Sequence, residues 1–251
     1  MARYHPSVEF LMTWWDRLLA GFSRSQPPEL TLTEVAVILL AAAALSLPSA
    51  TWRYFGLFST VVHELGHVFA ALLAGRRVTG IQLNFDHSGL TTSFGRPGWR
   101  TAWATFWGYP VPAVVGAVLV WAGFAGWAPA ALSVGALVLL LSLLFIRNAG
   151  GILILLGVVA VSAGLVVAVP VEFTGHVVVA LGLALLVGSV RDLGKVASVH
   201  YRRRRDRGQS DAYLLYRSTG VPALVWLLLF TAVIAGSFGW AWMVVRAGVG
   251  L

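Results

Sequence analysis

The stretch TVVHELGHVFAALLAGRRV, residues 60–78, places His63, Glu64 and His67 inside a run that otherwise has the composition of a membrane helix. Ionisable side chains at membrane depth are costly and usually mark a functional site. Small residues that let neighbouring helices approach closely follow on the same helix: Gly66, Ala70, Ala71 and Ala74. The stretch therefore predicts a helix whose polar site is shielded from lipid by other helices.

Composition places the whole chain in the class of integral membrane proteins. Of the 251 residues, 58% are hydrophobic and 11% are charged, and the mean hydropathy is +0.81. A soluble domain carries about 25% charged residues. The apolar blocks, each near the ~20 residues that cross a bilayer as a helix, are 31–48, 55–75, 101–124, 129–146, 151–170, 175–199 and 221–245. We expect an all-α membrane protein with six or seven transmembrane helices.

The net charge of +8 lies mostly in loops between the apolar blocks. Basic loops beside spans report topology first, and they also attract anionic lipid headgroups. We therefore expect no nucleic-acid partner. With seven spans, the positive-inside rule predicts a multi-pass protein of the cell membrane with a cytoplasmic N-terminus. It also places Arg76, Arg77, Arg96, Arg100, Arg147 and the basic run 201–207 in the cytoplasm.

The N-terminal region differs from the rest of the chain, and it shows no pattern of a cleaved signal peptide. Aromatic and leucine residues recur at spacings of three and four, as in Trp14, Leu18 and Phe22. This pattern predicts that residues 1–30 form an amphipathic segment in the membrane interface, followed by a polytopic membrane domain over residues 31–251. An ordinary first packing helix is the alternative.

His63 and His67 are four residues apart, so on a helix they share one face. An H-E-x-x-H helix supplies two neutral imidazoles for zinc and a carboxylate that takes a proton from the metal-bound water. The pattern predicts His63 and His67 as Zn²⁺ ligands and Glu64 as the catalytic base. Two histidines packed against other helices, with Glu64 paired to an arginine, would be the structural alternative.

The segment HELGHVFAALLAGRRVTGIQLNF resembles the site-2 protease family of intramembrane zinc metalloproteases, above all its PDZ-less, peptidase B-like bacterial branch. The blocks GYPVPAVVGA (108–117), RNAGG (147–151) and GQSDAYLLYRSTGVPALVW (208–226) are also similar to that branch. The resemblance implies a small β-hairpin after the H-E-x-x-H helix. Residues 78–95 alternate around Asp86–Gly89 and independently suggest such a hairpin.

Tetrahedral zinc needs a third protein ligand besides two imidazoles and water, and the chain has no cysteine. Asp192 is the first choice, because it and His67 would lie about 15 and 13 Å from the arginines that end their spans. The resemblance implies an aspartate from a later span, and this chain has GSVRDLGK at 188–195. Asp211 is the second choice, although Ser210 or Asp211 could instead cap a helix. Asp86 and His87 remain as further alternatives.

The first hypothesis is that the protein is a zinc metalloendopeptidase that hydrolyses a peptide bond in or near a transmembrane segment, with a membrane protein as substrate. Asn148 is a candidate contact to substrate backbone, and helix packing is its alternative use. A non-catalytic binding or regulatory protein of the same fold is the second hypothesis. A proton or metal transporter ranks last, because the chain lacks the two similar halves that transporters often show.

Overall fold

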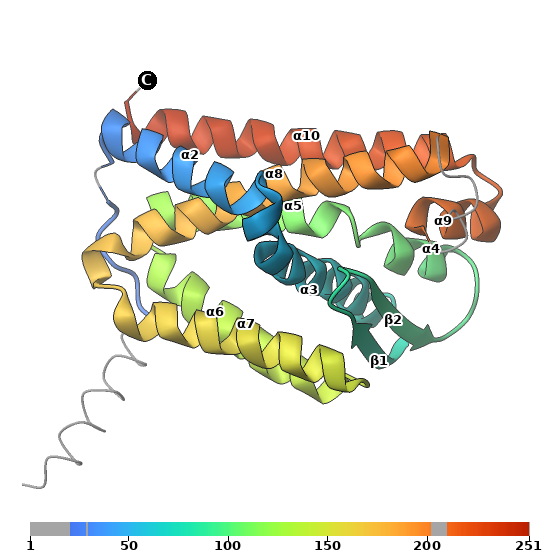
Figure 1. Ribbon diagram of the computed structural model, residues 1–251. Coiled ribbons are helices and arrows are strands. Elements are labelled where there is room, and N and C mark those ends of the chain that lie inside the picture. Colours follow the sequence, from blue (N-terminus) through green and yellow to red (C-terminus); the bar gives the residue numbers. More distant parts are fainter. Residues whose placement is uncertain (1–20, 29, 202–209, 251) are drawn as a thin grey trace, which may run out of the picture.

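The computed structural model describes residues 21–28, 30–201 and 210–250, and these form a bundle of helices with one two-stranded hairpin (Figure 1). The first part comprises α2 (Leu32–Ser46), α3 (Ser49–Leu73), β1 (Arg77–Leu83), β2 (Gly89–Phe94), α4 (Trp99–Phe106) and α5 (Pro110–Phe124). The second part comprises α6 (Ala128–Ser142), the short 3₁₀ helix η1 (Leu143–Phe145), α7 (Ala149–Ala168), α8 (Val171–Tyr201), α9 (Asp211–Thr219) and α10 (Ala223–Gly248). This architecture confirms the predicted helical membrane fold and the hairpin after the H-E-x-x-H helix.

Within the described residues, five helices are long and apolar enough to cross a membrane, namely α3, α6 together with η1, α7, α8 and α10. The pair α4–α5, bent by 54° at residues 107–109, would make a sixth span. The helix α2 is apolar but has only 15 residues. With the bent pair counted as one span, the total of six equals the lower of the two predicted numbers, and without it the total of five is one fewer.

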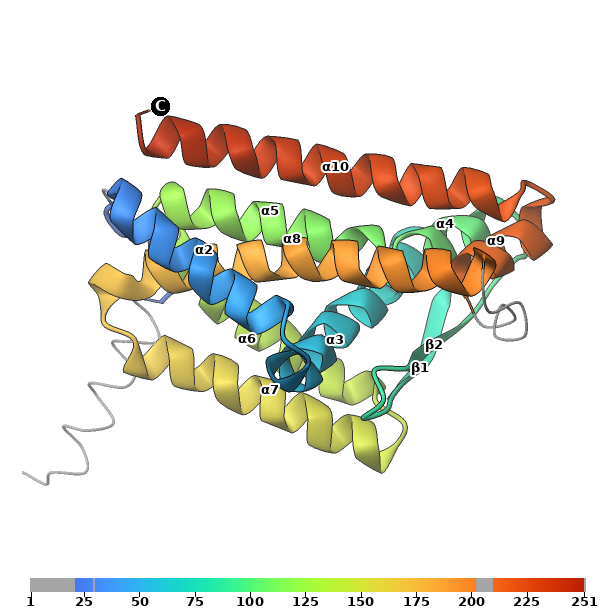
Figure 2. The same cartoon turned by 45° about the horizontal axis from the view of Figure 1, so that its top comes forward.

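The long helices run between two ends of the molecule (Figures 1 and 2). The hairpin end contains residues 74–98, 143–148 and 210–222, and the opposite end contains residues 30–31, 125–127, 169–170 and 249–250. From one end to the other, α2 and α3 together make one passage, and α4–α5, α6, α7, α8 and α10 make one each. The beginning of α2 and the end of α10 therefore lie at the same, opposite end.

This arrangement bears on the predicted orientation. Arginines near the hairpin end and a cytoplasmic N-terminus were predicted together on the basis of seven crossings. A single passage, made by α2 and α3 together, separates the beginning of α2 from the arginine-bearing hairpin end, so the beginning of α2 and these arginines lie at opposite ends of the molecule. Residues 1–20, which hold most of the predicted interfacial segment, lie outside the described residues, and the division at residue 30 stays a prediction.

Glycines bring α5 and α8 into backbone contact at the centre of the bundle. A β-carbon at Gly116 would lie 2.6 Å from the carbonyl oxygen of Gly182, and one at Gly182 would lie 2.9 Å from the backbone nitrogen of Val120. Leu186 and Val120, both fully buried, pack beside these glycines. Small residues allow such close approach where lipid offers no hydrophobic drive for helix association.

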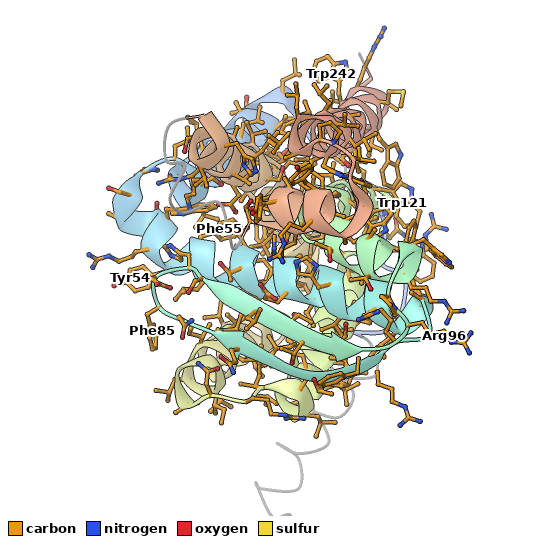
Figure 3. All side chains as sticks on the ribbon, turned by 90° about the vertical axis from the view of Figure 1, so that its right-hand side faces the viewer. Tyr54, Phe55, Phe85, Arg96, Trp121 and Trp242 are labelled. Atoms are coloured by element: carbon orange, nitrogen blue, oxygen red, sulfur yellow. The ribbon has the colours of Figure 1, made fainter. Side chains whose placement is uncertain are left out.

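The helix α3 is set across the long helices rather than alongside them. Viewed from the right-hand side of Figure 1, α8 and α10 are seen nearly end-on while α3 is seen from the side (Figure 3). The hairpin runs back along α3, with its turn at Phe85 near Tyr54 and its open end near Arg96 (Figure 3). The hairpin thereby covers one face of the helix that bears the two histidines.

The outer edge of β1 is already paired. Arg147 N–H donates to the carbonyl of Ile81 at 2.9 Å, and the Asn148 side chain bonds both the N–H and the C=O of Leu83 at 3.1 and 2.8 Å. No backbone hydrogen bond joins the outer edge of β2 to another segment within the described ranges. The outer edge of β2 is therefore free of backbone partners, and only its last part is bonded by a side chain, through the Arg76 guanidinium and the Ser93 carbonyl.

Candidate metal centre

The histidines of the H-E-x-x-H motif lie on the face of α3 that packs against the α4–α5 bend. Their Nε2 atoms are 3.2 Å apart, and their side chains are 20% (His63) and 12% (His67) exposed. Gly66 allows this packing, because a β-carbon there would lie 2.5 Å from the carbonyl oxygen of Trp107. Gly108 is equally tight, since its β-carbon would collide with the rings of both histidines.

Asp211 completes the group from the start of α9. Its Oδ2 atom lies 3.4 Å from His63 Nε2 and 3.3 Å from His67 Nε2. Ser210 is the N-cap of α9 and accepts a hydrogen bond from Tyr213 N–H at 3.3 Å, so Asp211 is the first helical residue and not the cap. The buried residues Ala212 and Leu215 pack with Ala102 of α4, which holds α9 against α4.

The three ligand atoms form a nearly equilateral triangle with edges of 3.2, 3.3 and 3.4 Å. Zinc–ligand bonds of 2.0–2.1 Å at tetrahedral angles separate neighbouring ligand atoms by about 3.3–3.4 Å. The triangle thus has the size that three protein ligands of tetrahedral zinc require. His63, His67 and Asp211 form a group that can hold a metal ion.

Hydrogen bonding around the group favours a cation. His67 Nδ1 lies 2.8 Å from the carbonyl oxygen of Ala104, which can only accept, so Nδ1 carries the proton and a neutral His67 presents a lone pair at Nε2. Asp211 Oδ2 is buried and has no hydrogen-bond partner among the described residues. Burial raises the pKa of the Asp211 carboxyl, whereas the facing imidazoles of His67 and His63, when protonated, lower it by more, so that without a metal the carboxylate is the form that faces the histidines.

Glu64 lies beside the triangle, against the hairpin. Its side chain is buried, with 3% of the residue exposed, and its Oε2 accepts a 2.6 Å hydrogen bond from the hydroxyl of Thr91 on β2. A cavity of about 320 Å³ is bounded by the three ligand residues, Glu64 and the strand β2. The motif glutamate and the candidate metal ligands therefore face one common space.

Asp192, the first choice for the third ligand, borders the same cavity but lies outside the ligand group. Its Oδ2 accepts a hydrogen bond from Ser59 at 3.3 Å, and its Oδ1 pairs with Lys195 Nζ at 3.1 Å. The depth comparison that favoured it assumed that its helix and the histidine helix run side by side. Because α3 crosses the bundle obliquely, His63 and His67 meet the start of α9 instead.

The remaining candidates also have other contacts. Asn148 holds the backbone of Leu83 and does not border the cavity, so its packing role is the one that the structure shows. Asp86 accepts two hydrogen bonds from Ser88, which lower the pKa of its carboxyl and shape the hairpin turn. His87 borders the cavity, and its Nε2 donates to the carbonyl of Arg53 at 3.2 Å.

Sequence reasoning missed several residues around the site. Gly108, Tyr109 and Ala104 from the α4–α5 region and Thr91 from β2 all border the cavity or contact the histidines. The ring of Tyr109 stands edge-on to His63 with a centroid distance of 4.8 Å. The only sequence signal was the Gly-Tyr-Pro at 108–110, because Pro110 breaks the helix next to a glycine that needs no side-chain room.

The fold and the site together define a multi-pass membrane protein with a candidate metal centre on an H-E-x-x-H helix. The model of the family described as Peptidase M50B-like matches residues 35–241, which is most of the chain, and the chain belongs to this family. This confirms the resemblance to site-2 proteases and supports a protease. No curated protein and no solved structure matched the chain significantly.

Proposed function

We propose that the protein is an intramembrane zinc metalloendopeptidase that hydrolyses a peptide bond in or near a transmembrane segment of another membrane protein. The observation that carries the proposal is the triangle of His63, His67 and Asp211, of the size for zinc, beside a buried Glu64 in one cavity. Membership of a peptidase family supports the same reaction.

Bound at His63, His67 and Asp211, Zn²⁺ would polarise the scissile carbonyl and lower the pKa of a water molecule towards ~7. Glu64 is the group that accepts the proton of that water and then delivers it to the leaving amine. The Nδ1–H of His67 donates a hydrogen bond to the Ala104 carbonyl, so the lone pair at Nε2 faces the ligand triangle. Buried Asp211 contributes the negative charge of the ligand set.

A helical substrate hides its peptide bonds in internal hydrogen bonds and must unwind locally before hydrolysis. We propose that the unwound segment adds as a strand to the free outer edge of β2. Residues 87–91 of the hairpin border the cavity, so a strand paired there would lie beside Glu64. The outer edge of β1 is already occupied by Arg147 and Asn148, so β2 is the edge that is left for this role.

For orientation, we propose that the hairpin end faces the cytoplasm of a cell membrane. The segments at that end contain Arg76, Arg77, Arg96, Arg100, Arg147 and Arg217, whereas the segments at the opposite end contain Arg24 and Arg246. The positive-inside rule then places the beginning of α2 outside, in contrast to the cytoplasmic N-terminus expected from seven spans.

Cleavage by purified protein tests the proposal. The wild type, Glu64→Gln, His67→Ala and the control Glu172→Gln, an exposed acid at the opposite end, are reconstituted in vesicles with a pool of single-span peptides carrying Gly-Pro breaks. We expect Zn²⁺-dependent products, seen by mass spectrometry, from the wild type and Glu172→Gln.

Glu64→Gln should keep its zinc and lose about 10²- to 10⁴-fold in rate, the range for loss of a general base. His67→Ala should lose both zinc and cleavage. Wild-type rates in Glu64→Gln, or cleavage that persists after chelation, would refute the proposed mechanism.

A further inference from the structure

The strand β2 touches the carboxylate of Glu64 at two points. The Thr91 hydroxyl donates to Glu64 Oε2 at 2.6 Å, and also lies 3.3 Å from the Glu64 carbonyl oxygen. Two residues earlier, a β-carbon at Gly89 would collide with Glu64 Oε1. Both oxygens of the carboxylate are therefore held against one strand, one by a hydrogen bond and one by the absence of a side chain.

The backbone of Thr91 faces in a different direction from its side chain. In an antiparallel pair, residues that exchange hydrogen bonds alternate with residues whose N–H and C=O point to the outer edges. Leu83 and Ile81 of β1 direct their backbone groups outward to Asn148 and Arg147, so their partners Gly89 and Thr91 direct theirs to the outer edge of β2. Thr91 thus presents its hydroxyl to Glu64 and its peptide groups to the free edge.

We infer that Thr91 is a positioning residue for Glu64, linking the strand edge on which a substrate would pair to the carboxylate that moves the proton. The inference rests on the proposed function. Thr91 fixes one carboxylate oxygen with a short hydrogen bond to a charged acceptor, which is stronger than a neutral one. A substrate strand that pairs with the backbone of Thr91 would therefore have a fixed position relative to the Glu64 carboxylate, because the same residue contacts both.

A purely structural use of Thr91 would predict something different. Docking of the hairpin on α3 has other anchors, namely the His87 Nε2 bond to the Arg53 carbonyl and the Thr60 hydroxyl bond to the His87 carbonyl at 3.4 Å. These remain when the Thr91 hydroxyl is removed. Loss of the hydroxyl should therefore change the position of Glu64 without releasing the hairpin.

The test compares Thr91→Val, Thr91→Ser and Thr92→Val in the vesicle assay, with kcat and KM determined for one cleaved peptide of the pool. Thr92 is the matched control, because its hydroxyl bonds Thr79 and Gly80 on the other face of the hairpin. We expect Thr91→Val to lower kcat about tenfold or more with KM within about twofold, because an unfixed base transfers protons poorly. Thr91→Ser should recover most of kcat, and all variants should keep the wild-type zinc content.

If the wild type cleaves and Glu64→Gln does not, the proposed function is supported independently of Thr91. The Thr91 and Thr92 variants then test only the positioning role of Thr91. Wild-type kcat in Thr91→Val would overturn it. Equal impairment of Thr91→Ser and Thr91→Val, a rise in KM with unchanged kcat, or loss of zinc would each show a structural role instead, and would overturn it too.

Discussion

Substitution of Gly108 by alanine adds one methyl group directly over the histidines. The added β-carbon would lie 2.7 Å from His63 Nε2 and closer still to the ring of His67, whereas an ordinary contact begins at 3.4 Å. His63 must then move by about 0.7 Å, and His67 by more, with Gly108 itself fixed next to Pro110. Gly108 has no positive φ, so alanine fits its backbone and the effect is confined to the site.

Metal–ligand distances tolerate deviations of about 0.2 Å, which is less than the displacement that the methyl group demands. Changes that only disturb the orientation of a ligand cost about 10- to 100-fold in metal affinity, or roughly 1.4–2.7 kcal/mol. We therefore expect Gly108→Ala to bind zinc at least that much more weakly than the wild type.

The assay is zinc titration of metal-stripped protein in detergent against a competing chelator. Gly157→Ala is the matched control, because a β-carbon at Gly157 on α7 meets nothing within 4 Å. Thermal unfolding of the metal-free proteins checks that both variants keep the fold. Wild-type zinc affinity in Gly108→Ala would refute the packing of the α4–α5 bend over the histidines.

Three further predictions concern packing, orientation and substrate. Gly182→Val should destabilise the protein by about 1–3 kcal/mol because it forces α5 and α8 apart, whereas Gly164→Val, which meets no neighbour, should change the free energy of unfolding little in chemical denaturation. Since the chain lacks cysteine, an impermeant thiol reagent added to whole cells should label Glu172→Cys and not Ser218→Cys, and the reverse labelling would contradict a cytoplasmic hairpin end. Leu90→Cys, at an exposed position of β2 that borders the cavity, should form disulfides with single-cysteine substrate peptides more efficiently than Ser218→Cys does, and equal efficiency would argue against strand addition.

The sequence alone predicts much of the fold because membrane helices leave a simple signal. Long apolar runs locate α3, α6, α7, α8 and α10, and the alternation around Asp86 locates the hairpin. The number of passages is harder to predict, because α2 and α3 share a single one. Their separate apolar runs contain no information on the angle at which α3 crosses the bundle.

The candidate site divides in the same way. His63, Glu64 and His67 are found from local spacing, which a helix converts directly into a shared face. Asp211 and Thr91 are distant in sequence and reach α3 only through the docking of α9 and the hairpin. A depth argument ranked Asp192 above Asp211 because it treated the helices as parallel, and neither composition nor periodicity shows that the short helix α9 docks on α4 at the hairpin end.

Zinc content tests the central claim most directly, measured on the detergent-purified wild type beside His67→Ala, Asp211→Ala and Asp192→Ala. The ligand triangle predicts one zinc per chain in the wild type and in Asp192→Ala, with loss of zinc in His67→Ala and Asp211→Ala. Zinc retained in Asp211→Ala but lost in Asp192→Ala, or a wild type that binds no zinc after reconstitution, would contradict it.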